Sequence, residues 1–152
     1  MEGDLLETTY IGIDPGAKGA LALISDVTAV FPYDQQTYIT ILRGIYEKKT
    51  PCVCCIEQVH SISGQGIASS FKFGQTYGYL LGLLEAFAIP YQPITPQKWK
   101  KEFGLSSDKA GSVEVCKRLF PGENLLRTER SRKEDDGMAE ALLMALYAKR
   151  KF

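Results

Sequence analysis

The chain has 152 residues, of which 45% are hydrophobic and 24% charged, and its formal net charge is zero. This length and composition fit one globular domain over residues 1–152 with a sizeable buried core. No apolar run approaches the roughly 20 residues of a membrane span, and the acidic start Met1-Glu2-Gly3-Asp4 fits neither a signal peptide nor a transit peptide.

The first third of the sequence predicts mainly strands. Residues 9–14 and 20–25 are apolar runs separated by a glycine-containing turn, which predicts a β-hairpin, and a third short strand is expected over 28–32. Apolar residues at helical spacing predict a helix over 35–48, which Pro51 ends.

The rest of the sequence alternates strands and helices, which predicts an α/β fold with a mixed sheet and helices packed against it. In such folds the functional site commonly lies where central strands end. The predicted strands are 52–57 and 91–94, and the predicted helices are 68–87, 96–103, 109–119 and 135–149.

Three of the four cysteines lie in one apolar run, Cys52-Val53-Cys54-Cys55-Ile56. Zinc needs ligands that converge from two places, and the only candidates elsewhere are Cys116 and His60. We therefore interpret the cysteines as small buried apolar side chains in a reducing compartment, in preference to a metal site or a disulfide.

Acidic residues interrupt apolar segments at three places. Asp14 ends the first predicted strand and Glu57 ends the buried cysteine-rich run, where an unpaired charge is costly. Asp136 and Glu140 are four residues apart on the last predicted helix, so they share one face and repel each other unless a cation lies between them. These four carboxylates predict a site for Mg²⁺ or Mn²⁺.

Each acid also has an ordinary structural interpretation. Asp14 precedes Pro-Gly and could form a turn, and Glu57 could pair with a lysine. Asp135 and Asp136 could complement the dipole of a helix N-terminus. The coincidence of acids at two strand ends with an i, i+4 pair favours the metal site.

Charge is unevenly distributed along the chain. Residues 1–60 hold four basic and eight acidic residues, whereas residues 98–133 hold ten basic and five acidic ones. The net charges of −4 and +5 suit a polyanionic partner, although a solvated surface of mixed charge explains them as well.

Several segments resemble a known family. "IGIDPGAKGALAL", "CIEQVH", "TPQKWKKEFGL", "DKAGSVEVCKRLFP" and "KEDDGMAEALLMALYAKR" resemble, in this order, the RuvC-type Holliday junction resolvases of the RNase H-like superfamily. The resemblance runs from about Tyr10 to Lys149 and is closest to the plant chloroplast branch and its bacterial and phage relatives. The first motif alone is weak, because actin-like sugar kinases share it; the ordered set is far more specific.

The resemblance implies an RNase H-like mixed β-sheet flanked by α-helices, with two Mg²⁺ or Mn²⁺ ions per site. It implies that Asp14 and Glu57 match the family's strand-end acids. The helix pair departs from the bacterial pattern of two aspartates three residues apart, because Asp136 and Glu140 are four apart. The chloroplast branch has a histidine at the position of Asp136, so Asp135 is an alternative third ligand.

The resemblance also implies a reaction and partners. Two cations can clamp one phosphodiester, activate water and stabilise the leaving oxygen, which yields a 5′-phosphate and a 3′-hydroxyl. Lys109 matches a family lysine that contacts the scissile phosphate, with a solvated side chain as the alternative. The expected substrate is a four-way DNA junction cut by a homodimer, with the helix over 68–87 as its interface. We expect the cytoplasm of a bacterium or phage-infected cell, in preference to an organellar matrix.

Aromatic and basic residues supply candidate DNA contacts. Among the aromatics of the segment "SISGQGIASSFKFGQTYGY", we expect Phe73 to stack against unpaired bases, and Phe71 and Tyr77 to belong to the core. Arg127 belongs to the basic late loop, and we expect it to contact phosphate. The remaining candidate phosphate contacts are Lys72, Lys98, Lys100, Lys101, Arg130, Arg132 and Lys133.

Three other functions compete with a junction resolvase. An RNase H-like nuclease for RNA or other branched DNA would have the same acids. A fragment of an actin-like kinase would need a second phosphate loop and a longer chain. A catalytically dead nucleic-acid-binding protein is disfavoured, because all four acids are present.

Overall fold

Five strands form one mixed sheet in the order β3-β2-β1-β4-β5. The computed structural model describes residues 6–59, 64–106 and 110–152. β1 pairs antiparallel with β2, and β2 with β3, whereas the β1–β4 and β4–β5 pairs are parallel. The predicted mixed sheet is therefore confirmed, with β1 at its centre. The strands are β1 (Thr9–Asp14), β2 (Ala20–Ile24), β3 (Thr28–Pro32), β4 (Cys52–Glu57) and β5 (Tyr91–Ile94).

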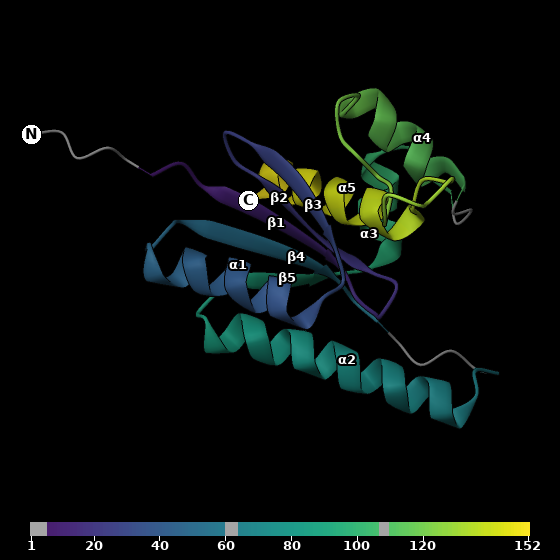
Figure 1. The fold of residues 1–152 in the computed structure, drawn as a ribbon, viewed down its shortest axis with the longest axis horizontal. Coiled ribbons are helices and arrows are strands. Elements are labelled where there is room, and N and C mark those ends of the chain that lie inside the picture. The colour runs from purple at the N-terminus through teal and green to yellow at the C-terminus, as the bar shows by residue number, and fades with distance from the viewer. Residues whose placement is uncertain (1–5, 60–63, 107–109) are drawn as a thin grey trace, which may run out of the picture.

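Helices cover both faces of the sheet. α1 and α2 lie on one face and α3, α4 and α5 on the other (Figure 1). Every predicted strand and helix is present, with ends that differ from the prediction by no more than two residues. In the described part of the chain the helices are α1 (Gln35–Glu47), α2 (Ile67–Ala86), α3 (Pro96–Glu102), α4 (Ala110–Leu119) and α5 (Asp136–Lys151).

Successive side chains of β1 point to opposite faces of the sheet, and each face packs against its own hydrophobic core. Ile11 and Ile13 are buried in the cluster beneath α1 and α2. Gly12, between them, faces α5, and a Cβ at this position would lie 2.1 Å from the carbonyl oxygen of Ala141 and 2.3 Å from the amide nitrogen of Ala145. Only glycine leaves room for this contact, so the backbone of α5 rests directly on the central strand.

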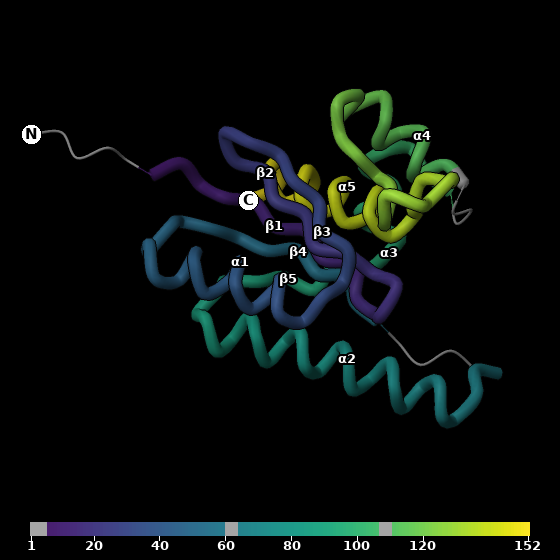
Figure 2. Tube along the Cα trace, in the orientation of Figure 1, coloured from purple at the N-terminus to yellow at the C-terminus, as the bar shows by residue number. Residues whose placement is uncertain are grey.

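α5 is buried on almost every side. The sequence predicted one inner face for this helix, formed by Met138, Ala141, Leu142, Ala145 and Leu146. That prediction was too narrow, because residues 137–145, 147 and 148 are all buried. Figure 2 shows the reason: α3 and α4 gather with α5 on one side of the sheet, so they cover the face that the sheet leaves open.

α2 is far more exposed than α5. Only Leu80 and Leu84 are buried among its 20 residues, and its first half extends past the ends of the strands (Figure 1). Ile67 is 90% exposed and Phe71 68% exposed. The prediction that Phe71 belongs to the core was wrong, because the sheet does not reach beneath this part of the helix.

The cysteines behave as buried apolar residues. Cys54, Cys55 and Cys116 are buried, Cys52 is half-buried, and all four thiols are free. Burial raises the pKa of Cys55 and of Cys116 to about 12, which keeps these thiols protonated at neutral pH. Among the helices that the structure describes, none has the length and apolar character needed to cross a bilayer.

Candidate metal centre

The register of two parallel strands brings the first two acids together. Ile13 of β1 lies opposite Ile56 of β4, so the next residues, Asp14 and Glu57, end the two strands side by side. Ile13 and Ile56 are buried in the core beneath α1 and α2. Since side chains alternate along a strand, Asp14 and Glu57 face the opposite side, where α5 packs.

α5 supplies the third acid. A Cβ at Gly137 would lie 2.9 Å from Oδ2 of Asp14, so the first turn of α5 touches this carboxylate. Glu140 follows one turn later and is only 7% exposed. Ligand oxygens of Asp14, Glu57 and Glu140 all lie within 4.8 Å of one another. We call these three residues the acidic cluster.

The donor set of the acidic cluster fits a hard divalent cation. Carboxylate oxygens suit Mg²⁺ and Mn²⁺, whereas structural zinc sites favour thiolate and imidazole ligands. Three carboxylates at such short range repel one another strongly where water is partly excluded, and a bound cation removes that repulsion. Residues far apart in the sequence thus bring together carboxylate oxygens that could hold a metal ion.

The fourth predicted ligand lies outside the acidic cluster. Asp136 is half-buried, but it is not among the residues whose ligand oxygens converge within 4.8 Å. Successive helical residues are rotated by about 100°, and it is Gly137 whose Cα faces Asp14. Spacing of four residues predicts that Asp136 and Glu140 share one side of α5. It does not predict which residue of the first turn faces the ends of β1 and β4.

Asp135, the alternative third ligand, has a structural role. It is the N-cap of α5, and its Oδ1 accepts a hydrogen bond of 2.9 Å from the amide of Met138. Arg127 donates to both carboxylate oxygens of Asp135, from Nε at 3.0 Å and from Nη2 at 2.8 Å. Nη2 also donates to the carbonyl oxygens of Lys18 and Gly19, so Arg127 ties the β1–β2 turn to the start of α5.

Protonation equilibria around Arg127 follow from these contacts. Burial acts to raise the pKa of Asp135, but the hydrogen bonds from Arg127 and from the backbone of Met138 outweigh it, and the pKa is lowered. The hydrogen bond to Asp135 raises the pKa of Arg127 in turn. Burial raises the pKa of Tyr38, and the negative charge of Asp14 raises it further, whereas Arg127 opposes this.

No protein-family model and no curated protein sequence matches the chain. Solved structures do. The structure of Thermus thermophilus RuvC in complex with a Holliday junction substrate has a TM-score of 0.59 at 15% identity, covering 94% of this chain and 96% of that one. A second Thermus thermophilus RuvC structure has a TM-score of 0.57 at 15% identity, covering 93% and 96%. The chain has the fold of RuvC.

In this RuvC-like fold, Glu57 has a buried neighbour that the sequence analysis missed. Nε1 of Trp99 in α3 donates a hydrogen bond of 2.9 Å to Oε2 of Glu57. Trp99 lies among Lys98, Lys100 and Lys101 in the sequence, yet it is completely buried. The sequence does contain a sign of this contact. Trp99 lies in a short helix directly after β5, and β5 is the neighbour of β4, which ends in Glu57.

The candidate DNA contacts lie around the RuvC-like fold with different degrees of exposure. Phe73 is half-buried, and a Cβ at Gly16 in the β1–β2 turn would lie 3.1 Å from its ring, so Phe73 lies beside the turn that follows Asp14. Lys100 is half-buried over the Trp99 ring, 5.6 Å from its centroid. Lys109 lies outside the described residues. The exposed candidates are Lys72, Lys98, Lys101, Arg130, Arg132 and Lys133.

Arg127 differs from these bases. Its guanidinium is held by Asp135 and the β1–β2 turn, which gives it a structural role, and its expected contact with phosphate stays a prediction. Within the described ranges, none of the ion pairs involves the exposed candidates named above. Their charges therefore remain available to a polyanion.

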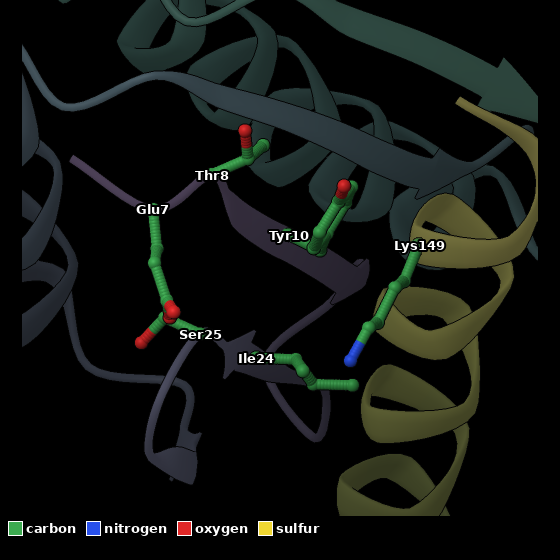
Figure 3. Close-up of a pocket in the computed structure, with 6 residues that line it drawn as sticks. All are labelled: Glu7, Thr8, Tyr10, Ile24, Ser25 and Lys149. Carbon is green, nitrogen blue, oxygen red and sulfur yellow. The ribbon is translucent and has the colours of Figure 1, made fainter. Parts of the chain in front are cut away.

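A shallow hollow of about 290 Å³ lies away from the acidic cluster. It is at the opposite ends of β1 and β2 and beside the last turns of α5, and it contains none of the predicted site residues (Figure 3). The acidic cluster is thus defined by converging side chains at the strand ends and does not coincide with this hollow. Its lining residues are Glu7, Thr8, Tyr10, Ile24, Ser25 and Lys149.

Proposed function

We propose that this chain is a metal-dependent Holliday junction resolvase of the RuvC type, related to the plant chloroplast branch and its bacterial and phage relatives. Residues 1–152 form its single nuclease domain, acting in the cytoplasm of a bacterium or a phage-infected cell. The observation that carries the proposal is the convergence of Asp14, Glu57 and Glu140 in a RuvC-like fold. A TM-score of 0.59 supports the fold, and the acidic cluster supports the chemistry.

The chain's own contribution to the reaction is to hold charge in place. Asp14, Glu57 and Glu140 would bind Mg²⁺ or Mn²⁺, two ions per site, with Asp136 as the predicted fourth ligand. Bound divalent cations would supply Lewis-acid activation of the scissile phosphate and of a water molecule. The rigid strand ends and the buried helix that carry the acids fix their positions before substrate arrives, which favours catalysis by positioning. The proposed products are a 5′-phosphate and a 3′-hydroxyl.

The proposed DNA surface extends outward from the acidic cluster. Phe73 lies next to the β1–β2 turn, which supports stacking against a base displaced at the branch point. Lys109 is proposed to contact the scissile phosphate. The proposed contacts to the DNA backbone are Lys72, Lys98, Lys100, Lys101, Arg130, Arg132 and Lys133.

A homodimer follows from the proposed substrate. Paired symmetric nicks in a four-way junction need two sites related by a two-fold axis. α2 supports a role as the interface, because its first half exposes Ile67 and Phe71. Within the described residues, a Cβ at Gly74, Gly78 or Gly82 would meet no neighbouring atom within 4 Å, so this helix leaves room for a partner.

The decisive experiment uses a supercoiled plasmid that extrudes a cruciform. The wild-type protein with Mg²⁺ should linearise it through paired nicks with ligatable ends. Asp14→Asn should lower the rate by about a thousandfold or more, which corresponds to about 4 kcal/mol of lost transition-state stabilisation, while binding to a synthetic junction persists. Asp26→Asn, at an exposed turn, is the matched control and should cleave normally.

The same assay separates the competing functions. Full activity of Asp14→Asn, or of the wild type in EDTA, would overturn the metal-dependent mechanism. Rates on a four-way junction, a flap, an RNA–DNA hybrid and a linear duplex decide the substrate, and a preference for the hybrid or the flap would replace the resolvase by another nuclease. If the protein binds the junction but does not cleave it with any divalent cation supplied, the chain is a DNA-binding protein without nuclease activity.

A further inference from the structure

Glu57 is held by a neutral donor within the protein interior. Nε1 of Trp99 lies 2.9 Å from Oε2 of Glu57, and the Trp99 side chain is 0% exposed. An indole N–H can donate but cannot accept, so the hydrogen bond has one possible direction. A carboxylate has two oxygens with room for several partners, so accepting this bond leaves Glu57 with capacity for a cation.

The local fold fixes this pair before any metal arrives. β4 and β5 are parallel neighbours, and beyond their ends the amide of Gln58 donates to the carbonyl oxygen of Ile94 at 2.7 Å. α3 begins immediately afterwards, with Thr95 as its N-cap and Pro96 in its first turn. Trp99 therefore enters the core one turn into α3, directly beside the residue that ends β4.

Asp135 and Glu57 have partners of different charge. Asp135 is paired with the Arg127 guanidinium, which neutralises it and occupies both of its oxygens. Glu57 instead accepts a hydrogen bond from an uncharged ring. A neutral donor orients a carboxylate and leaves its charge available to a cation, whereas a guanidinium competes with the cation for that charge.

We infer that Trp99 is a positioning residue of the metal centre: its indole N–H holds the Glu57 carboxylate in the orientation that binds a divalent cation. This inference rests on the proposed function only for its link to cleavage, because it concerns cation binding itself. Hydrogen bonds to metal ligands typically change metal affinity by about 10- to 100-fold. Loss of this one should weaken cation binding by about tenfold or more.

The experiment measures Mn²⁺ binding without DNA, through the electron paramagnetic resonance signal of free Mn²⁺. Trp99→Phe keeps an aromatic ring and removes the N–H. Trp99 is the chain's one tryptophan, so global replacement by 3-benzothienylalanine, in which sulfur takes the place of the N–H group, alters this site alone. Phe103→Leu is the matched control, because Phe103 follows α3 and packs on the same core as Trp99.

Both Trp99 replacements should weaken Mn²⁺ binding by about tenfold, and Phe103→Leu should not. In a Glu57→Gln background Trp99→Phe should cause no further loss, because the hydrogen bond acts through that carboxylate. Unchanged Mn²⁺ affinity in the benzothienyl protein would overturn the inference, and so would an equal loss in both backgrounds.

Cleavage assays keep this inference separate from the proposed function. If the wild type cleaves junctions, Trp99→Phe should need more Mn²⁺ for half-maximal rate and recover its rate at saturating Mn²⁺. Weaker Mn²⁺ binding in a protein that cleaves no junction would support the role of Trp99 and reject the resolvase. Normal Mn²⁺ binding and normal cleavage in both replacements would reject the role of Trp99 and retain the resolvase.

Discussion

The longest helix on one face of the sheet is almost completely buried, whereas the longest helix on the other face is mostly exposed. α5 lies between the sheet and the helices α3 and α4, and eleven of its sixteen residues are buried. α2, on the other face, has twenty residues and buries two of them. The more apolar helix of the two is the more exposed one, since α2 has few charged residues whereas α5 ends in Lys149-Arg150-Lys151.

The difference in burial matches a difference in role: α5 positions the acidic cluster, and α2 offers an exposed surface for the proposed partner. α5 contributes Glu140 to the acidic cluster and contacts Asp14 through Gly137, so its burial gives the cluster a rigid frame. α2 leaves Ile67 and Phe71 exposed to solvent, in the part of the helix where the proposed dimer interface lies. The expected effects of substitutions on stability should therefore be large on the α5 face and small along the first half of α2.

The largest loss of stability should come from Gly12→Ala. Its Cβ would lie 2.1 Å from the Ala141 carbonyl oxygen and 2.3 Å from the Ala145 amide, and neither backbone atom can move without displacing α5. We expect the free energy of unfolding to fall by about 3 kcal/mol or more, measured by urea denaturation.

Gly78→Ala in α2 makes the same chemical change where nothing lies within 4 Å of the new Cβ. Because alanine is the better helix former, the free energy of unfolding should rise by about 0.5–1 kcal/mol. Equal effects at Gly12 and Gly78 would show that α5 and α2 are packed alike.

A smaller loss should follow from Arg127→Met, which keeps most of the aliphatic stem and removes the link between the β1–β2 turn and α5. Arg127 and Asp135 are about one quarter exposed, so solvent screens part of their attraction. We expect a loss of about 1 kcal/mol at pH 7, measured by urea denaturation.

The pH dependence of this loss has a definite sign. The pKa of Asp135 is lowered in the folded protein, so its stabilising effect is present above the ordinary aspartate pKa of about 4 and disappears as the pH falls through the lower value. The difference between wild type and Arg127→Met should therefore shrink from pH 7 to pH 3. Arg130→Met, at an exposed position of the same loop, should match the wild type at both pH values.

The smallest effect on stability should come from Phe71→Ser. Because Phe71 is 68% exposed, the free energy of unfolding should change by no more than about 0.5 kcal/mol. If the first half of α2 forms the proposed dimer interface, sedimentation should show dimer dissociation about tenfold stronger, since losing about 1.4 kcal/mol of contact has this effect. Val27→Ser removes an equally exposed apolar side chain elsewhere and should leave association unchanged.

The fold and all three members of the acidic cluster follow from local patterns. Apolar runs of strand length ended by Asp14 and Glu57 predicted both strands, and parallel neighbours necessarily end at the same edge. Glu140 was found because it is an acid on a helix whose other residues are largely apolar. Each of these signals lies within one short segment, so it is visible without knowing how the segments pack.

The remainder depends on contacts between segments. Gly137 faces Asp14 because the backbone of α5 packs directly on Gly12. The spacing of residues along the helix does not reveal this contact. The bonds of Arg127 to the β1–β2 turn join residues that are more than 100 positions apart. Trp99 and Glu57 are 42 positions apart and meet because of strand order. The exposure of Phe71 depends on where the sheet stops.

The order of the acidic residues along the chain affects when the cluster can exist. α5 follows all five strands in the sequence, so a ribosome synthesises Asp14 and Glu57 well before Glu140. A nascent chain that ends before α5 lacks the helix that completes the acidic cluster. If the chain cuts DNA, cleavage requires that translation has passed α5 and that this helix has docked on the sheet.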